Sequence, residues 1–269
     1  MTGVEAVRTV DADAHPRFIP QGLTHFLDAL GDITLLSRDV LRFGLTRPPE
    51  WRLLVDQFEQ IGWRSLSIVG LTALFTGMVL ALQLGSYLER FGAKMFVSRI
   101  VGVSLLRELG PVLTALMVGG RVGAGITAEL GSMAVTEQVD AVRALGASPI
   151  RNLVVPRVAA VLIMLPVLTI ISDLLGILGG LFIGVSELRV SGDFYLNSLL
   201  QILLLNDVLS GIGKSVFFGY FIGIIACHNG IRVTGGADGV GRATTTTVVA
   251  ASITVLVSDF FLTKLFLLL

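Results

Sequence analysis

Few side chains in this sequence could do chemistry, and those that stand out are charges inside long apolar stretches. Arg107 and Glu108 interrupt one such stretch, and Lys214 lies midway along another. An ionisable side chain in hydrocarbon is costly unless it is paired or hydrated, so it normally faces a cavity or an opposite charge. Two interpretations stay open: a polar pocket for a substrate headgroup, or structural pairing of Arg107 or Lys214 with Glu108, Asp207 or Asp259.

Catalytic and nucleotide-binding patterns are missing from the sequence. The histidines His15, His25 and His228 are scattered, and no HExxH motif is present. Gly213-Lys214-Ser215 looks like the end of a phosphate-binding loop, but Val208 stands where that motif needs glycine. A single cysteine excludes an intramolecular disulfide and a cysteine-cluster metal site. The sequence therefore predicts no enzyme active site, no metal and no cofactor.

The composition is that of an integral membrane protein. Of the 269 residues, 53% are hydrophobic and only 15% are charged, whereas a soluble domain has about 25% charged residues. A soluble globule could hardly hide so much apolar surface, and a disordered chain would be more polar. The formal net charge is zero, which gives no reason to expect nucleic acid as a partner.

Five stretches are long and apolar enough to cross a membrane as helices. Residues 65–86 carry no charge, and at about 1.5 Å per residue they would cross the roughly 30 Å hydrocarbon layer. The predicted spans are residues 65–86, 103–128, 158–186, 199–227 and 243–268. Lys and Arg near the span ends are more numerous on the side of the N-terminus, which predicts a cytoplasmic N-terminus and an external C-terminus.

The region before the first span is predicted to be a flexible tail, residues 1–20, followed by two interfacial amphipathic helices within residues 21–62. The tail lacks the apolar core of a secretory signal. In both later stretches apolar residues recur at helical spacing opposite charged ones, a pattern typical of helices at the membrane surface. The alternative is a small soluble cap that packs on itself.

Small residues recur at intervals of four along the predicted spans, as in Gly176, Gly180 and Gly184. Because lipid tails are as apolar as leucine, membrane helices associate through close packing at such residues. The glycines predict a tight bundle, and they are compatible with the seam of a homodimer.

Residues 132–146 are predicted to form a short cytoplasmic helix between the second and third spans. Gly146 can end this helix and Pro149 prevents its extension. A helix held between two spans could act as a lever that docks into a soluble partner. The alternative is an ordinary amphipathic connector.

Several ordered motifs in this sequence resemble the MlaE/YrbE permease family, the membrane subunits of MCE-type lipid ABC transporters. They are SLLRELGPV at residues 104–112, GRVGA at 120–124, AELG at 128–131, TEQ at 136–138 and GVGRATTTTVV at 239–249. The resemblance covers roughly residues 50–268, so residues 63–269 are expected to form the transmembrane permease domain. Asp173 departs from what the family has in its third span.

The resemblance implies a homodimer in the bacterial inner membrane that binds two copies of a cytoplasmic ATPase. It also implies a periplasmic MCE-domain partner and a phospholipid substrate that is moved between inner and outer membranes. The chain itself would be a transport subunit and no enzyme. The helix at 132–146 would be the coupling helix, with Met133, Thr136, Glu137, Asp140 and Arg143. The lipid cavity at the dimer axis would be lined by Leu80, Leu84, Arg107, Glu108 and Lys214.

Other functions remain compatible with the sequence. A permease for sterols or other hydrophobic lipids would have the same composition. A secondary transporter driven by protons could use Glu108, Asp173, Asp207 and Asp259 as relay groups. A structural membrane scaffold is a third alternative.

Overall fold

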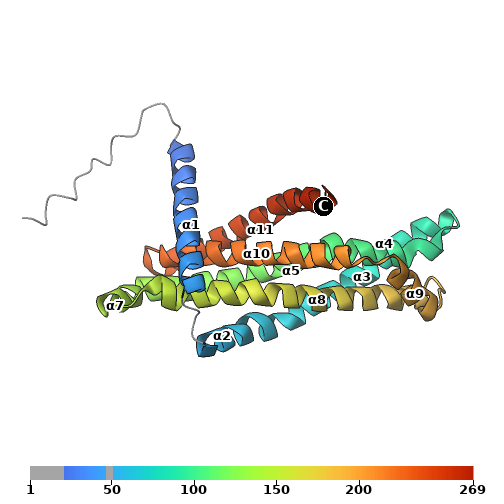
Figure 1. The fold of residues 1–269 in the computed structure, drawn as a ribbon, viewed down its shortest axis with the longest axis horizontal. Helices are drawn as coiled ribbons and strands as arrows, with labels where there is room; N and C mark the ends of the chain where they lie inside the picture. Colours follow the sequence, from blue (N-terminus) through green and yellow to red (C-terminus); the bar gives the residue numbers. More distant parts are fainter. Residues whose placement is uncertain (1–20, 47–50, 269) are drawn as a thin grey trace, which may run out of the picture.

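The computed structural model describes residues 21–46 and 51–268, and within these ranges the secondary structure is helical, with no β-strand. The predicted tail at residues 1–20 lies outside the described residues. The long helices lie side by side along one axis (Figure 1). This arrangement confirms the all-α fold predicted from the sequence.

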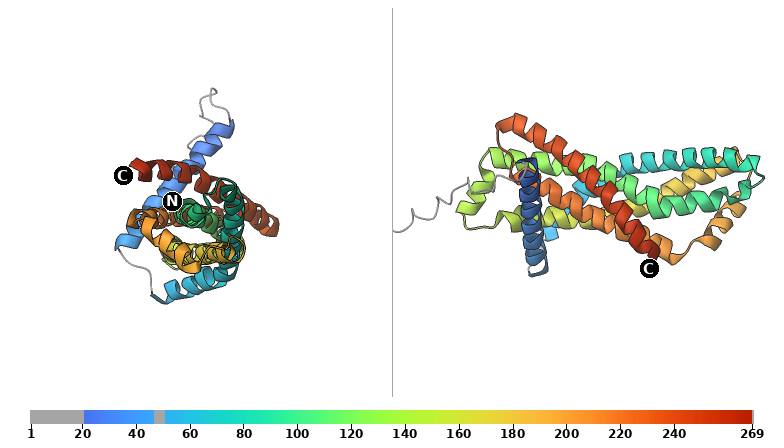
Figure 2. Two further views of the ribbon diagram at one scale, coloured as in Figure 1. Left: turned by 90° about the vertical axis from the view of Figure 1, so that its right-hand side faces the viewer. Right: turned by 90° about the horizontal axis from the view of Figure 1, so that it is seen from above.

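Among the described residues, five helical segments are long and apolar enough to cross a membrane, which agrees with the predicted number. Four are dominated by single helices: α3 (Arg64–Arg90), α8 (Val155–Ser186), α10 (Leu205–Ile231) and α11 (Gly236–Leu268). The second in chain order is a run of shorter helices: α4 (Val97–Ser104), η3 (Leu105–Leu109), α5 (Gly110–Val118), η4 (Gly119–Gly123) and α6 (Ala124–Val135). Helix α11 crosses the bundle obliquely (Figure 2, right).

Glycines let the central helices approach closely. Helix α3 packs along α8, where a Cβ atom on Gly77 would lie 1.9 Å from the carbonyl oxygen of Gly176. On the same ridge, a Cβ atom on Gly180 would collide with the hydroxyl of Tyr195, and one on Gly184 would collide with its ring. The predicted tight bundle is therefore present, and this small-residue ridge is filled by the chain's own side chains and backbone.

Several predicted span boundaries differ from the structure, most clearly in the second and fourth spans. The second helical segment runs over Lys94–Val135, longer than the predicted 103–128. The fourth span begins at Leu205 rather than residue 199, because α9 (Gly192–Ile202) is a separate helix. The backbone is extended at Leu203 and Leu204. Hydropathy did not predict this break, because the residues on both sides of it are mostly leucine and the sequence stays apolar throughout.

Four short π-helical turns interrupt the helices of the described ranges: η1 (Glu59–Trp63), η3, η4 and η5 (Ile150–Val154). A π-turn inserts an extra residue, redirects the side chains that follow and is frequent at functional sites. Three of these turns contribute polar or charged side chains to cavities of the structure: Gln60 from η1, Arg107 and Glu108 from η3, and Arg121 from η4.

The N-terminal region folds as helix α1 (Gln21–Thr46) and helix α2 (Trp51–Phe58). Helix α1 lies crosswise to the long helices (Figure 1), and Asp32 forms an ion pair with Arg232 beyond the end of α10. The hydrogen bond from Arg232 holds the pKa of Asp32 below its usual value. Helix α2 is not a separate element, since it continues through η1 into α3.

The single helix predicted at 132–146 is two helices in the structure. Helix α6 ends at Val135, and α7 (Gln138–Ala144) follows after a break in which Glu137 has a φ of 59°. At the end of α6, the carbonyl of Ser132 accepts both the backbone N–H of Thr136 at 3.0 Å and the hydroxyl of Thr136 at 2.8 Å. Gly146 has a φ of 75° just after α7, as expected for a helix stop.

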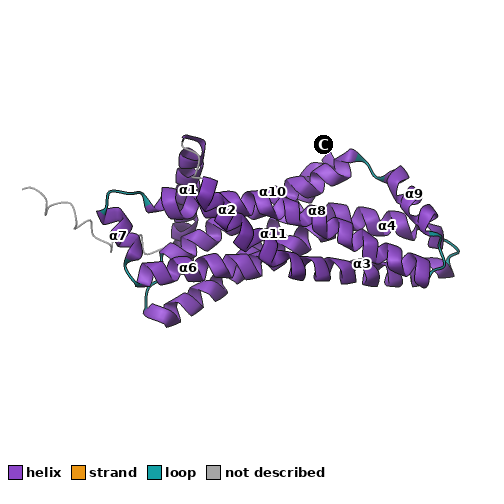
Figure 3. Cartoon of the chain, turned by 90° about the horizontal axis from the view of Figure 1, so that it is seen from below, coloured by secondary structure: helices purple, strands orange, loops and turns teal. Residues whose placement is uncertain are grey.

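Helices α7 and α9 lie at opposite ends of the bundle (Figure 3). The end near α7 also holds the connection between α10 and α11, and the end near α9 holds the connection between α3 and α4. The bundle therefore has two distinct ends, one near α7 and one near α9.

Candidate functional site

Lys214 is the most deeply buried charge of the sequence-predicted site. Its side chain on α10 is 2% exposed. The ammonium donates to Glu108 Oε2 at 2.7 Å, to Thr263 Oγ1 at 2.6 Å and to the Arg107 carbonyl at 3.0 Å, and Asp259 lies 3.0 Å away. Because an ammonium has three N–H donors, all of them are used within the chain.

Pro111 explains why a backbone carbonyl is available to Lys214. In a regular α-helix the carbonyl of Arg107 would accept from the N–H of the fourth residue along, but that residue is Pro111 and has no N–H. The π-turn η3 ends here, with the N–H of Gly110 bonded to Leu105. The sequence REL-GP thus creates both the turn and the free acceptor.

The close approach of α10 to η3 depends on Gly211. A Cβ atom on Gly211 would lie 2.2 Å from the carbonyl oxygen of Leu106. This contact places α10 so that Lys214, one turn further along, reaches the backbone of η3. Glycine is required here by the space available, since backbone atoms cannot move aside as a flexible side chain can.

Arg107 forms an ion pair with Asp207, which lies in the first turn of α10. The other carboxylate oxygen of Asp207 accepts the backbone N–H of Leu204 at 3.0 Å. Asp207 therefore satisfies a free donor at the start of α10 and holds Arg107 at the same time. The structural pairing considered from the sequence is present for both Arg107 and Lys214.

These groups also border a cavity of about 260 Å³. It is lined by Arg107, Glu108, Leu204, Asn206, Ser210, Lys214, Thr263 and Phe266. The side chains of Arg107 and Glu108 are each 39% exposed, so they present their charges at the cavity while Lys214 lies beneath them. The sequence left open whether these charges form structural ion pairs or line a polar pocket, and in the structure they do both.

The sequence prediction missed three polar residues of this pocket, Asn206, Ser210 and Thr263, although their spacing indicates them. Asn206, Ser210 and Lys214 are spaced four residues apart on α10, and this spacing places them on one helix face. Asp259 and Thr263 repeat the interval on α11. A search for polar side chains at helical spacing around Lys214 would have found them.

Leu80 and Leu84 do not lie with the other predicted cavity residues. Both pack against a separate apolar cluster that includes Val97, Val101 and Tyr195. Neither lines the cavity at Arg107. Their placement in the lipid cavity came from the resemblance alone, and the packing of α3 on α4 and α8 turns them elsewhere.

The carboxylates proposed as a proton relay are divided among different partners. Asp207 is paired with Arg107, whereas Glu108 and Asp259 share Lys214. Asp173 lies apart on α8, buried, with its Oδ1 against Gly110 and without a hydrogen-bond partner among the described residues. Three of the four groups are thus held by cations.

The residues predicted to bind a partner gather mostly around α7. Glu137, Asp140 and Arg143 line one hollow of about 400 Å³ together with the connection between α10 and α11, and Arg143 donates to Asp140 at 2.7 Å. Met133 is an exception, because it packs partly against the main apolar core. Leu145, which the sequence prediction omitted, is 85% exposed beside them.

Comparison with known proteins decides the family. Residues 54–265 match the family model described as permease MlaE. The chain belongs to the MlaE permease family. The match begins in α2 and reaches α11, so Arg107, Glu108, Lys214 and α7 fall within it, whereas α1 lies outside.

Relatives of this MlaE-family chain carry names that agree with a transport subunit. A probable ABC transporter permease protein of Rickettsia felis is 45% identical over 242 residues, covering 90% of this chain and 93% of that protein. The intermembrane phospholipid transport system permease protein MlaE of Haemophilus influenzae is 42% identical over 214 residues, covering 79% and 82%. A probable ABC transporter permease protein of Synechocystis is 43% identical, covering 80% and 81%.

Proposed function

We propose that this chain is the membrane permease of an ABC transporter for phospholipids and that the pocket at Arg107 and Glu108 binds the lipid headgroup. The observation that carries the proposal is the exposure of one cation and one carboxylate above the buried ammonium of Lys214. The name of the Haemophilus relative, a phospholipid transport permease, supports the substrate class.

The charges of the pocket favour a headgroup that carries both signs. Arg107 would bind the lipid phosphate, since a guanidinium matches the geometry of a phosphate. Glu108 would bind an ammonium such as that of an ethanolamine headgroup. Lys214, which the resemblance placed in the lining of the lipid cavity, is assigned to positioning Glu108 because its three donors are already used.

The acyl chains would lie along α11 and a second copy of the chain would close the cavity. Only 17% of the most apolar stretch of α11 is buried within the structure, the lowest share of the five candidate spans. Exposed Val257 and Phe260 continue this apolar face near the pocket. Because lipid tails are as apolar as these side chains, the acyl chains would lie on this face without an energetic penalty, and a homodimer with the cavity at its axis would enclose the lipid.

Helix α7 is proposed to dock into a cytoplasmic ATPase, one for each copy of the chain. Its exposed Glu137, Asp140 and Leu145 offer charged and apolar contacts. The α7 end of the bundle would then face the cytoplasm, with the N-terminus inside and the C-terminus outside. The opposite end would meet a periplasmic MCE-domain protein that receives or delivers the lipid across the bacterial inner membrane.

Reconstitution tests the proposal. The chain is purified with its associated subunits and placed in vesicles that contain labelled phosphatidylethanolamine. We expect transfer of the lipid to require ATP and to stop with vanadate. Arg107→Lys keeps a cation beside Asp207 but lacks the planar guanidinium, and it should slow transfer while the complex stays assembled. Transfer driven by a pH gradient without ATP would refute the ABC mechanism, and transfer of sterol in preference to phospholipid would refute the substrate.

A further inference from the structure

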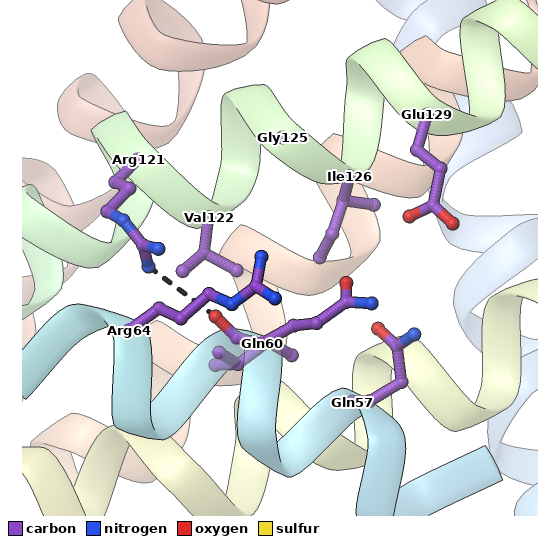
Figure 4. A pocket seen from close by; sticks show the side chains of 9 residues that line it. Gln57, Gln60, Arg64, Arg121, Val122, Gly125, Ile126 and Glu129 are labelled. Atoms are coloured by element: carbon purple, nitrogen blue, oxygen red, sulfur yellow. Dashed lines mark hydrogen bonds between the residues drawn. The ribbon is translucent and has the colours of Figure 1, made fainter.

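A second polar pocket lies in the half of the bundle near α7, away from Lys214. It has a volume of about 190 Å³ between the α2–α3 helix and α6. Figure 4 shows Gln57, Gln60 and Arg64 on one helix facing Arg121 and Glu129 on the other. Neither the family match nor the names of the relatives assigns a role to it.

The two arginines of this pocket have no carboxylate partner within the part of the chain that the structure describes. Arg121 donates to Ser65 Oγ at 2.7 Å and to the carbonyl of Gln60 at 3.5 Å, both neutral acceptors. Among residues 21–46 and 51–268, neither Arg64 nor Arg121 forms a salt bridge. The pocket's carboxylate, Glu129, is already held by Arg157 at 2.7 Å. Two positive charges are therefore left for a ligand.

The local backbone shapes the pocket in the same way as the first one. Gln60 and Ile61 belong to the π-turn η1, and Arg121 belongs to the π-turn η4. Gly125 leaves the pocket wall open, since a Cβ atom there would meet nothing within 4 Å. Guanidinium and amide N–H groups converge on an empty space, and this donor set suits the oxygens of a phosphate.

The surroundings of Arg64 point to a lipid phosphate rather than a dissolved one. Arg64 immediately precedes the uncharged stretch 65–86, so it lies where hydrocarbon gives way to headgroups. Trp63 beside it is 75% exposed. Exposed Ile68, Leu71 and Phe75 continue along α3 from this point, and their spacing gives an apolar track on which acyl chains can lie.

We propose that Arg64 and Arg121 form a binding site for the headgroup phosphate of an anionic membrane lipid, separate from the pocket at Lys214. A basic pocket between membrane helices at the headgroup level is suited to such lipids. This inference needs only that the chain spans a membrane, and it holds whether or not the chain transports phospholipid. The bound lipid would bridge α3 and α6.

The test measures lipid retained by the purified full-length protein with its associated subunits. Native mass spectrometry compares phosphatidylglycerol with phosphatidylcholine after delipidation and re-addition. We expect preferential retention of phosphatidylglycerol, and a loss of that preference of at least fivefold in Arg64→Gln/Arg121→Gln. Gly125→Leu fills the pocket without touching the arginines and should have the same effect.

Gly120→Leu is the matched control for the filling variant. Gly120 also has open space around its Cβ position but does not line the pocket, so this variant should retain phosphatidylglycerol like the unchanged protein. Thermal melts of all variants verify that they are folded. Equal retention of phosphatidylglycerol in the unchanged protein and in both pocket variants would overturn the proposal.

Inorganic phosphate separates the two possible sources of the anion. We expect millimolar phosphate alone to produce no thermal stabilisation that depends on Arg64 and Arg121. If phosphate stabilises the protein in this way while phosphatidylglycerol is not retained, the site takes a soluble anion and the lipid assignment is wrong.

Discussion

Lys214 Nζ lies 2.7 Å from Glu108 Oε2 although 106 positions separate the two residues in the chain. This ion pair joins α10 to the π-turn η3, and Thr263 extends it to α11. Three of the five candidate spans therefore meet at one buried charge. The same contact explains how a pocket with exposed charges can be held rigidly within a bundle of apolar helices.

Replacing Lys214 with methionine should destabilise the protein strongly. The variant leaves Glu108 and Asp259 near each other without a cation, and removing one partner of a buried pair costs on the order of 3–5 kcal/mol. The free energy of unfolding in mixed micelles measures this. Lys94→Met is the control, because Lys94 forms only an exposed pair with Glu89 at 3.8 Å, a contact worth about 0–1 kcal/mol. Equal effects of the two variants would contradict the central position given to Lys214.

Gly211→Ala should destabilise the bundle, whereas Gly120→Ala should not. The added methyl at Gly211 meets the Leu106 carbonyl at 2.2 Å, and overpacking of this kind costs about 1–3 kcal/mol. At Gly120 the methyl meets open space, so the better helix propensity of alanine should give a gain of up to about 1 kcal/mol. Thermal melts in detergent compare the two. A neutral Gly211→Ala would show that α10 does not need its close contact with η3.

Removing either charge at the pocket rim should change lipid binding, and the two changes should have different effects. Arg107→Gln removes the proposed phosphate ligand and should weaken binding of all phospholipids about tenfold, the equivalent of about 1.4 kcal/mol. Glu108→Gln removes the proposed ammonium ligand and should shift binding from phosphatidylethanolamine to phosphatidylglycerol. Competition between the two lipids for the purified complex measures both effects. An unchanged preference in Glu108→Gln would exclude the headgroup assignment.

Substitutions in α7 and in the residues that flank it should weaken ATPase binding or uncouple ATP hydrolysis from lipid transfer. Leu145→Glu places a charge on a side chain that is 85% exposed, so folding should be unaffected while the proposed apolar contact with the ATPase is lost. The combined Glu137→Gln/Asp140→Asn variant should leave ATP hydrolysis but uncouple it from lipid transfer. Co-purification and hydrolysis rates measure these outcomes. Normal assembly and transfer in all of these variants would remove α7 as the coupling element.

Hydropathy and charge placement were sufficient to predict the class of fold. Five apolar stretches gave five helices of spanning length, since a long run of apolar residues has few other structures open to it in a membrane. Hydropathy and charge placement did not predict where the helices are interrupted. The extended backbone at Leu203 and Leu204 and the left-handed Glu137 depend on local hydrogen bonds, which leave no trace in hydropathy.

The candidate site was predictable in part for a similar reason. Arg107, Glu108 and Lys214 stand out because charge is rare within the spans, and the structure brings them together. Leu80 and Leu84 could not be placed in the same way, because leucine is common on every face of these helices. Their position depends on how α3 is rotated against its neighbours, which is a property of the packed bundle.

Photo-crosslinking from inside the pocket tests the central claim most directly. A photoreactive residue in place of Phe266, which lines the pocket, is compared with one at Phe261, which is exposed on the same helix. We predict that position 266 captures phosphatidylethanolamine above its share of the membrane, that ATP turnover reduces this capture, and that Glu108→Gln abolishes the enrichment. Position 261 should capture lipids in the proportions of the membrane. The same lipid profile at both positions, unaffected by ATP, would contradict the account.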